Sequence, residues 1–288
     1  TIRVDAVHET DVSFAGGGGW GEVLAEIASL RDSRDVESDE YLYGFIAPGS
    51  AEGSIAGLSR LAIDAGDERS RASIGYGFSG PDDSGRVRRT ALETTAHELG
   101  HAHGRQHSPG CGADGADADY PHDGGTIGVI GFDSTQTALL IPNTEEGPFD
   151  LMTYCDPTWV SDYNYQRFFS RLQSLRPTVT MERRSGPAPR LATNMRQTYD
   201  RYLIEVDGSS KRLAPVTTRT RIMGETTQVN ALVEGESVPL TGHFYEHDHG
   251  GGLMYLPRYT PVPQTVPMSE PPELVQFAVL DETYAFSR

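Results

Sequence analysis

The stretch HELGHAHGRQH, at residues 97–107, contains four of the nine histidines of the chain. Side chains four positions apart on a helix lie on one face, about 6 Å apart along the axis, so His97 and His101 can hold one metal ion. Gly104 can adopt the positive φ that turns the chain back. His107 can then approach the same ion from outside the helix. Three neutral imidazoles with one open position are the ligand set of a catalytic zinc ion.

Glu98 follows the first of these histidines and is turned roughly 100° away from it on a helix, near a water molecule on the ion. Zinc lowers the pKa of its bound water to about 7 and polarises a carbonyl group. Glu98 can therefore take a proton from that water and pass it to a leaving amine. Surface histidines on a polar helix are the alternative, but five fixed positions agree and the glycine stands where the turn must be. His103 falls between the ligand faces, and we expect it to be exposed or to support a ligand.

The elements that position these residues follow from periodicity. Residues 87–103 contain no proline and one glycine, which predicts one long helix that stops at Gly104. A second helix is predicted over residues 21–32 and a third over 162–175. Ser161 should cap the third helix, whose buried side would consist of Phe168, Phe169, Leu172 and Leu175. Strands are predicted at residues 1–8, 41–48, 54–64 and 71–78.

The pattern changes after residue 178. Short β-rich pieces separated by Gly, Pro and Ser predict a small all-β module at residues 179–288, for which a sandwich is one arrangement. The chain is thus expected to be an α+β protein with a catalytic domain at residues 1–178 and a β-rich C-terminal module.

The charge balance restricts the partners. The net charge is −17, and no basic stripe is present, so nucleic acid and anionic membrane surfaces are not expected partners. No run of about 18 apolar residues occurs, so no membrane insertion is expected. An acidic excess suits a monomer that repels its own copies.

Downstream of the histidine motif stands Asp150-Leu151-Met152-Thr153-Tyr154. With this segment, the chain resembles the metzincin clan of zinc endopeptidases over roughly residues 1–178. The resemblance implies a twisted mixed sheet, an active-site helix, a Met-turn and a C-terminal helix. Met152 would be the methionine beneath the metal. Tyr154 would be a fifth ligand or would stabilise the oxyanion, although a buried structural tyrosine is the alternative.

The resemblance also assigns an edge strand and a disulfide. The edge strand above the cleft would be residues 71–78, which would pair with extended substrate backbone. The visible N-terminal sheet is, however, short of strands for this clan. Cys111 and Cys155 lie on segments that converge under the zinc in this fold, so we predict a disulfide between them, with two free thiols as the alternative. Such a disulfide would indicate secretion into an oxidising compartment.

The expected function is zinc-dependent hydrolysis of peptide bonds in extracellular proteins or glycoproteins. Four segments resemble those of secreted bacterial metzincins, some of which cleave mucin-like glycoproteins; they are residues 53–59, 96–107, 120–133 and 150–165. A protease-derived binding or adhesion protein is one alternative, and a zinc hydrolase that acts on other bonds is another.

Two further clusters could bind metal. Four carboxylates in the glycine-rich loop after Cys111 could bind calcium, although a solvated acidic loop is the simpler interpretation; they are Asp114, Asp117, Asp119 and Asp123. The segment HFYEHDH carries His243, His247 and His249. These histidines could form a second metal site or the polar tip of a hairpin.

Overall fold

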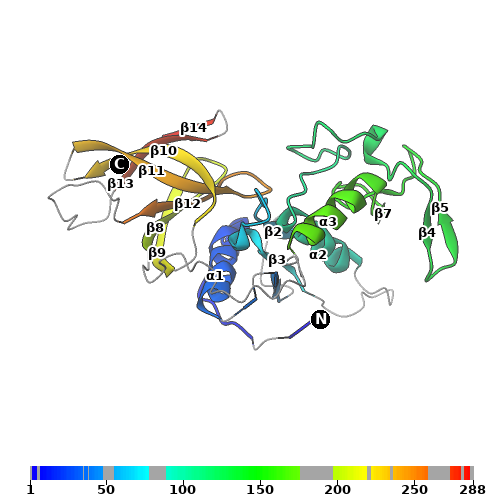
Figure 1. Cartoon of the computed structure of the whole chain (residues 1–288), viewed down its shortest axis with the longest axis horizontal. Helices are drawn as coiled ribbons and strands as arrows, with labels where there is room; N and C mark the ends of the chain where they lie inside the picture. The colour runs from blue at the N-terminus through cyan, green and yellow to red at the C-terminus, as the bar shows by residue number, and fades with distance from the viewer. Residues whose placement is uncertain are drawn as a thin grey trace, which may run out of the picture.

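The computed structural model of the chain combines helices with several β-sheets, so the α+β class is confirmed (Figure 1). It describes residues 2–4, 7–34, 36–37, 39–47, 55–77, 89–175, 197–218, 222–233, 236–258, 273–279 and 282–285. The predicted domain boundary at residues 178–179 lies outside these residues.

The first sheet lies against helix α1 (Trp20–Ser33), which confirms the helix predicted over residues 21–32. Its strands are β1 (Leu42–Ile46), β2 (Gly57–Ser59) and β3 (Ala72–Tyr76). Their order is β1-β3-β2, with β1 parallel and β2 antiparallel to β3. Apolar side chains from one side of α1 pack on this sheet, because positions three and four apart share a helix face. They include Val23, Leu24 and Ile27.

Two strand predictions were wrong. Among the described residues of 1–8 none is in a strand, and Ile2 and Val4 are 93% and 94% exposed. Alternation supplies an apolar face, but a strand also needs a neighbour for its backbone hydrogen bonds. The edge of the sheet beside the histidine helix is β2 and not β3 (Ala72–Tyr76), because β3 pairs on both sides.

Helix α2 (Arg89–Ala102) carries the histidine motif. The chain leaves it at Gly104, whose φ of 81° lies in the left-handed region, as the motif predicts. The predicted start at residues 87–88 lies outside the described residues. Helix α3 (Asp162–Leu175) begins as predicted, because the Asn164 backbone N–H donates to Ser161 Oγ at 3.0 Å.

The buried face predicted for α3 was wrong, because none of its four residues is buried and Phe168 and Leu175 are only half-buried. Phe169 is 54% exposed and Leu172 is 47% exposed. Between α2 and α3 the chain forms only short elements. They are the 3₁₀ turn η3 (Asp123–Gly125), the antiparallel hairpin of β4 (Gly131–Asp133) and β5 (Ala138–Leu140), and the parallel pair of β6 (Phe149–Asp150) and β7 (Thr158–Trp159). Two more 3₁₀ turns occur earlier, η1 (Ala15–Gly17) and η2 (Glu68–Ser70).

The C-terminal strands form one continuous antiparallel sheet in the part of the chain that is described, rather than the two stacked sheets of a sandwich. The order is β14-β13-β10-β11-β12-β8-β9. The bounds are β8 (Gln197–Ile204), β9 (Ser210–Thr218), β10 (Glu225–Val233), β11 (Glu236–Glu246), β12 (Gly252–Pro257), β13 (Glu273–Val279) and β14 (Glu282–Ala285). The sheet is strongly twisted and lies beside α1 (Figure 1).

This sheet is packed firmly onto the N-terminal part. Leu203, Tyr245 and Tyr255 share an apolar cluster with Ala25 of α1. The buried guanidinium of Arg60, just after β2, lies 5.3 Å from the Tyr245 ring centroid and 6.0 Å from that of Tyr255. Such cation–π contacts gain strength when they are desolvated. The interface therefore fixes where the β11–β12 hairpin lies relative to α2.

Replacing Leu203 with Ala should lower the free energy of unfolding by about 2–5 kcal/mol, because it removes a buried side chain at this interface and leaves a cavity. Urea unfolding would measure the change. Val206→Ala is the matched control, since Val206 is 71% exposed near the end of the same strand and should change stability by less than about 0.5 kcal/mol. Equal effects in the two variants would contradict the packing.

Candidate metal centre

The three histidines of the motif come together. His97 and His101 lie on α2 and His107 lies in the loop that follows. All three are buried, and one ring nitrogen from each lies within 4.8 Å of the others. The Nε2 atoms of His97 and His101 are 3.1 Å apart. Two ligands of one tetrahedral zinc ion, each about 2.0–2.1 Å from it, lie roughly 3.4 Å apart, so this spacing suits one ion.

Backbone carbonyls fix the orientation of each imidazole. His97 Nδ1 donates to the Leu151 carbonyl at 2.8 Å, and His101 Nδ1 donates to the Arg105 carbonyl at 2.6 Å. His107 Nδ1 donates to the Asp114 carbonyl at 2.5 Å. A carbonyl oxygen can only accept, so each Nδ1 carries the proton and each Nε2 keeps a lone pair. Metal-ligating histidines make this same outward hydrogen bond, so the residues fit a metal ion.

The environment keeps these imidazoles neutral. Burial lowers the pKa of His97 to about 4, and it lowers the pKa of His101 well below its usual value. Burial also lowers the pKa of His107. Unprotonated nitrogens at neutral pH are what a metal ion requires.

Met152 packs against the helix that carries the motif. Its side chain is fully buried, and a Cβ added to Gly100 of α2 would run into Met152 Sδ. The Ser108 backbone N–H donates to the Met152 carbonyl at 2.9 Å. The turn therefore supports both the helix and the loop that carries the third histidine.

Asp150 holds this turn in place, and sequence reasoning did not single it out. Its Oδ1 accepts hydrogen bonds from the Met152 backbone N–H at 2.8 Å, from Ser108 Oγ at 2.9 Å and from Asn164 Nδ2 at 2.7 Å. Its Oδ2 accepts from the Ser161 backbone N–H at 2.9 Å. Four donors satisfy this fully buried carboxylate. Asp150 thus joins the turn at residues 150–154, the loop that follows His107 and the start of α3.

The predicted disulfide is confirmed. Cys111 and Cys155 are bonded, with their Cα atoms 5.3 Å apart, and they enclose a sequence separation of 44 residues. The bond links the loop after His107 to the segment after the Met-turn. It therefore adds a covalent constraint to the hydrogen bonds of Asp150.

Tyr154 lies beside the three histidines. Its hydroxyl is 3.1 Å from His107 Nε2 and 3.3 Å from His249 Nδ1. The residue is 43% exposed, so it is not a buried structural tyrosine. Partial burial raises the pKa of its hydroxyl, which therefore stays protonated and can donate a hydrogen bond.

Glu98 is buried between α2 and the edge strand β2. A Cβ added to Gly57 of β2 would lie 2.6 Å from Glu98 Oε1. Its carboxylate, with that of Asp248 and a ring nitrogen of His249, forms a second group of ligand atoms within 4.8 Å of one another. Burial, reinforced by the nearby Asp248, raises the pKa of Glu98 well above its usual value. Burial of this kind moves the pKa of a carboxyl toward the pH range in which proton carriers work.

Asp248 is the residue near the metal centre that the sequence prediction missed. It lies with His249 at the tip between β11 and β12, and its Oδ2 is 3.6 Å from His101 Nε2. The histidine-rich sequence predicts ligands at His243, His247 and His249 but gives no sign of Asp248, which stands between the last two. The other two histidines do not join: His243 lies within β11, and His247 is buried with Nε2 lacking a hydrogen-bond partner.

His103 is a packing residue. Its ring stacks on Tyr41 with centroids 4.4 Å apart, and its Nδ1 donates to the Leu99 carbonyl at 2.6 Å. It is half-buried and contributes no atom to the histidine group.

The acidic loop after Cys111 does not assemble a calcium site in the described structure. No three of the carboxylates of Asp114, Asp117, Asp119 and Asp123 lie within 4.8 Å of one another. Asp117 Oδ2 instead accepts from Arg105 Nη2 at 2.7 Å and from the Tyr163 hydroxyl at 2.8 Å.

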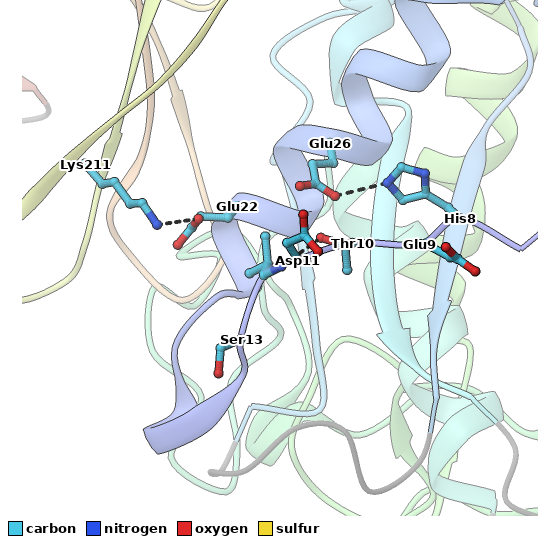
Figure 2. Close-up of a pocket in the computed structure, with 9 residues that line it drawn as sticks. His8, Glu9, Thr10, Asp11, Ser13, Glu22, Glu26 and Lys211 are labelled. Atoms are coloured by element: carbon cyan, nitrogen blue, oxygen red, sulfur yellow. Dashed lines mark hydrogen bonds and ion pairs between the residues drawn. The ribbon is translucent and has the colours of Figure 1, made fainter.

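Figure 2 shows a pocket of about 580 Å³ at the start of α1, lined mainly by polar side chains. Ion pairs join Lys211 to Glu22 at 2.6 Å and His8 to Glu26 at 3.1 Å. The pocket holds none of the motif histidines.

A bilayer-crossing helix is not found in the part of the chain that the structure describes.

Replacing Gly100 with Ala should lower the free energy of unfolding by about 1–3 kcal/mol, because the new methyl group overlaps Met152 Sδ. Alanine is otherwise the better helix former by about 1 kcal/mol. A double-mutant cycle with Met152→Ala would measure the contact by urea unfolding. The double variant should lose less than the sum of the single losses, and strict additivity would rule the contact out.

The metal-free chain should lose stability as the pH falls from about 6.5 to about 4. The unfolded chain binds protons at a histidine pKa of about 6.5, whereas folded His97 does so only near 4. Protons in this window therefore favour the unfolded state. His97 should account for about 2 kcal/mol between pH 7 and pH 5.

Urea unfolding of chelator-treated protein at pH 7 and pH 5 would measure this difference. His97→Gln removes the titrating imidazole, so this variant should lose about 2 kcal/mol less stability than the wild type between pH 7 and pH 5. An identical loss in both proteins would show that the imidazole is not held neutral.

Comparison of the chain with protein-family models, with curated proteins and with solved structures finds no match.

Proposed function

We propose that this chain is a zinc-dependent endopeptidase of the metzincin type. One observation carries the proposal: the imidazoles of His97, His101 and His107 converge, and the Nδ1 atom of each donates a hydrogen bond to a backbone carbonyl. Glu98 lies on α2, the helix that carries the first two histidines. Support also comes from Met152, which packs beneath α2 against Gly100.

The three histidines would hold the ion and leave room for further ligands. A zinc ion bound there would supply Lewis acidity toward a carbonyl and toward a water molecule. The carboxylate of Glu98 would accept a proton from the attacking water and deliver it to the leaving amine. The hydroxyl of Tyr154, which stays protonated, would donate to the oxyanion as it develops.

The edge strand offers a place for the substrate backbone. β2 is the outer strand of its sheet on the side of α2, and its outer edge is paired with the tip between β11 and β12. An extended peptide could add to this edge by main-chain hydrogen bonds once the tip has left it. Peptide bonds are therefore favoured over other hydrolysable bonds as the substrate class.

The Cys111–Cys155 disulfide supports an oxidising compartment, because disulfides persist mainly outside the cytosol. We therefore propose extracellular proteins or glycoproteins as substrates, a secreted location and a monomeric state. The net charge of −17 favours a monomer through self-repulsion.

A catalytically inactive, protease-derived binding or adhesion protein is the second candidate. It is favoured by one observation: the carboxylate of Asp248 lies 3.6 Å from His101 Nε2, in the space where a substrate group would have to approach. Partner binding without any cleavage would support this candidate.

In any zinc-loaded form of the chain that cleaves peptides, adding Glu98→Gln should reduce hydrolysis by about 10²–10⁴-fold, because it removes the proton carrier. Its zinc content should stay at that of the wild type, since Glu98 is outside the three-histidine group. Cleavage sites would be mapped by mass spectrometry in a denatured protein mixture and in a mucin, with zinc measured in the same samples.

Glu145→Gln is the matched control, because Glu145 is exposed in the loop before β6 and should leave cleavage unchanged. Undiminished cleavage by zinc-loaded Glu98→Gln would eliminate the assigned role of Glu98. Absence of Glu98-dependent cleavage by every zinc-loaded form of the chain would contradict the peptidase function.

A further inference from the structure

The tip between β11 and β12 reaches the metal centre from the C-terminal sheet. The side chain of Asp248 at this tip is fully buried, and its Oδ2 lies 3.6 Å from His101 Nε2 and 3.6 Å from His249 Nε2. His249 in turn lies against the Tyr154 hydroxyl at 3.3 Å. Two consecutive side chains of the hairpin therefore contact residues of the candidate active site.

The backbone of the same tip occupies the free edge of β2. The Leu61 backbone N–H donates to the Glu246 carbonyl, and the Asp248 backbone N–H donates to the Ser59 carbonyl, each at 3.4 Å. Arg60 and His247 face each other in an antiparallel bridge. This is the pairing that an extended substrate backbone would make with the edge strand. The chain thus fills its own strand-addition site.

The carboxylate of Asp248 is satisfied on one side only. Its Oδ1 accepts from the Ser59 backbone N–H at 3.1 Å, whereas Oδ2 is buried without a hydrogen-bond partner. Oδ2 faces His101 Nε2, which carries a lone pair because Nδ1 donates to a carbonyl. Two acceptors at 3.6 Å repel each other unless a proton or a metal cation lies between them.

The spacing between Asp248 and His101 suits a shared ion, and the carboxylate of Asp248 also groups with Glu98 and His249. Ligand atoms on one tetrahedral zinc ion lie roughly 3.4 Å apart. The separation of 3.6 Å from Asp248 Oδ2 to His101 Nε2 falls near this value, as does the 3.1 Å between the His97 and His101 Nε2 atoms. A carboxylate oxygen is an accepted zinc ligand beside imidazoles.

The tip is held in place by packing far from the metal. Tyr245, at the end of β11, and Tyr255, in β12, are fully buried against Arg60. Arg69 lies over the Tyr255 ring at 5.3 Å from its centroid. These contacts anchor both strands that lead into the tip, so its position does not depend on the metal.

We propose that Asp248 is a fourth protein ligand of the metal ion and that the β11–β12 tip closes the active-site cleft, so that the C-terminal module holds the enzyme latent. The ligand assignment concerns the metal centre alone. The latency rests on the peptidase function proposed above, because it requires an activity to suppress.

The closed arrangement explains how latency would work. Asp248 would take the position that a water molecule needs beside the three histidines. Glu246 to Asp248 would block the edge of β2, and the Asp248 carboxylate would lie against that of Glu98. Activation would then require the tip to leave the cleft by displacement or by proteolysis.

The ligand assignment is tested on the full chain loaded with Co²⁺ or Zn²⁺. Asp248→Ala removes the carboxylate, and Asp248→Asn keeps its shape but removes its charge. Both should change the visible absorption bands of the Co²⁺ form, which report the ligands, and both should speed metal removal by phenanthroline at least ten-fold. Asp207→Asn is the control, because Asp207 only caps the β8–β9 turn through the Ser209 N–H.

Thermal unfolding of each variant would establish that the fold is retained. Unchanged spectra and unchanged metal removal in folded Asp248→Ala and Asp248→Asn would overturn the ligand assignment. Changed spectra in both, with Asp207→Asn like the wild type, would support it whether or not any form cleaves peptides.

Latency is tested by cleavage of a denatured protein mixture. Zinc-loaded Asp248→Ala should cleave at least ten-fold faster than the wild type, and adding Glu98→Gln should abolish that gain. Equal cleavage by the wild type and Asp248→Ala would overturn latency while the peptidase function stands. Altered metal spectra with no cleavage by any zinc-loaded form would instead overturn the peptidase function and leave the ligand assignment standing.

Discussion

The rest of this structure depends on one constraint. The chain must hold three imidazole nitrogens, each with a lone pair, within 4.8 Å of one another in a buried site. His97 and His101 approach within 3.1 Å through their Nε2 atoms, and burial opposes the protonation that would otherwise relieve the repulsion. Such an arrangement is stable only with a cation at its centre or with strong external restraint. The carbonyls of Leu151, Arg105 and Asp114 provide restraint by fixing each ring.

That restraint comes from several distant segments. Asp150 links the turn at residues 150–154 to the loop that follows His107 and to the start of α3 through four hydrogen bonds. The Cys111–Cys155 disulfide joins the same two loops covalently. On the other side, β2 supports α2 and also receives the β11–β12 tip. The C-terminal sheet is therefore part of the site, and any account of its chemistry has to include Asp248.

Local signals predicted the parts that local physics controls. The helix over 89–102, its end at Gly104 and the Ser161 cap follow from spacing, backbone conformation and a short-range hydrogen bond. The disulfide followed from the family resemblance. The strand at residues 1–8 and the edge position of β3 were wrong, because strand pairing depends on neighbours that alternation does not specify. The exposure of Phe169 likewise depends on what packs against α3.

The sequence by itself determined which side chains could share a metal ion, because helical spacing and one glycine bring His97, His101 and His107 together within eleven residues. Only the tertiary structure decided that Asp248 lies beside His101. Its position depends on the packing of a whole sheet against α1, on Arg60 between two tyrosines and on backbone pairing with β2. Those contacts connect residues far apart in the chain, and no local periodicity encodes them.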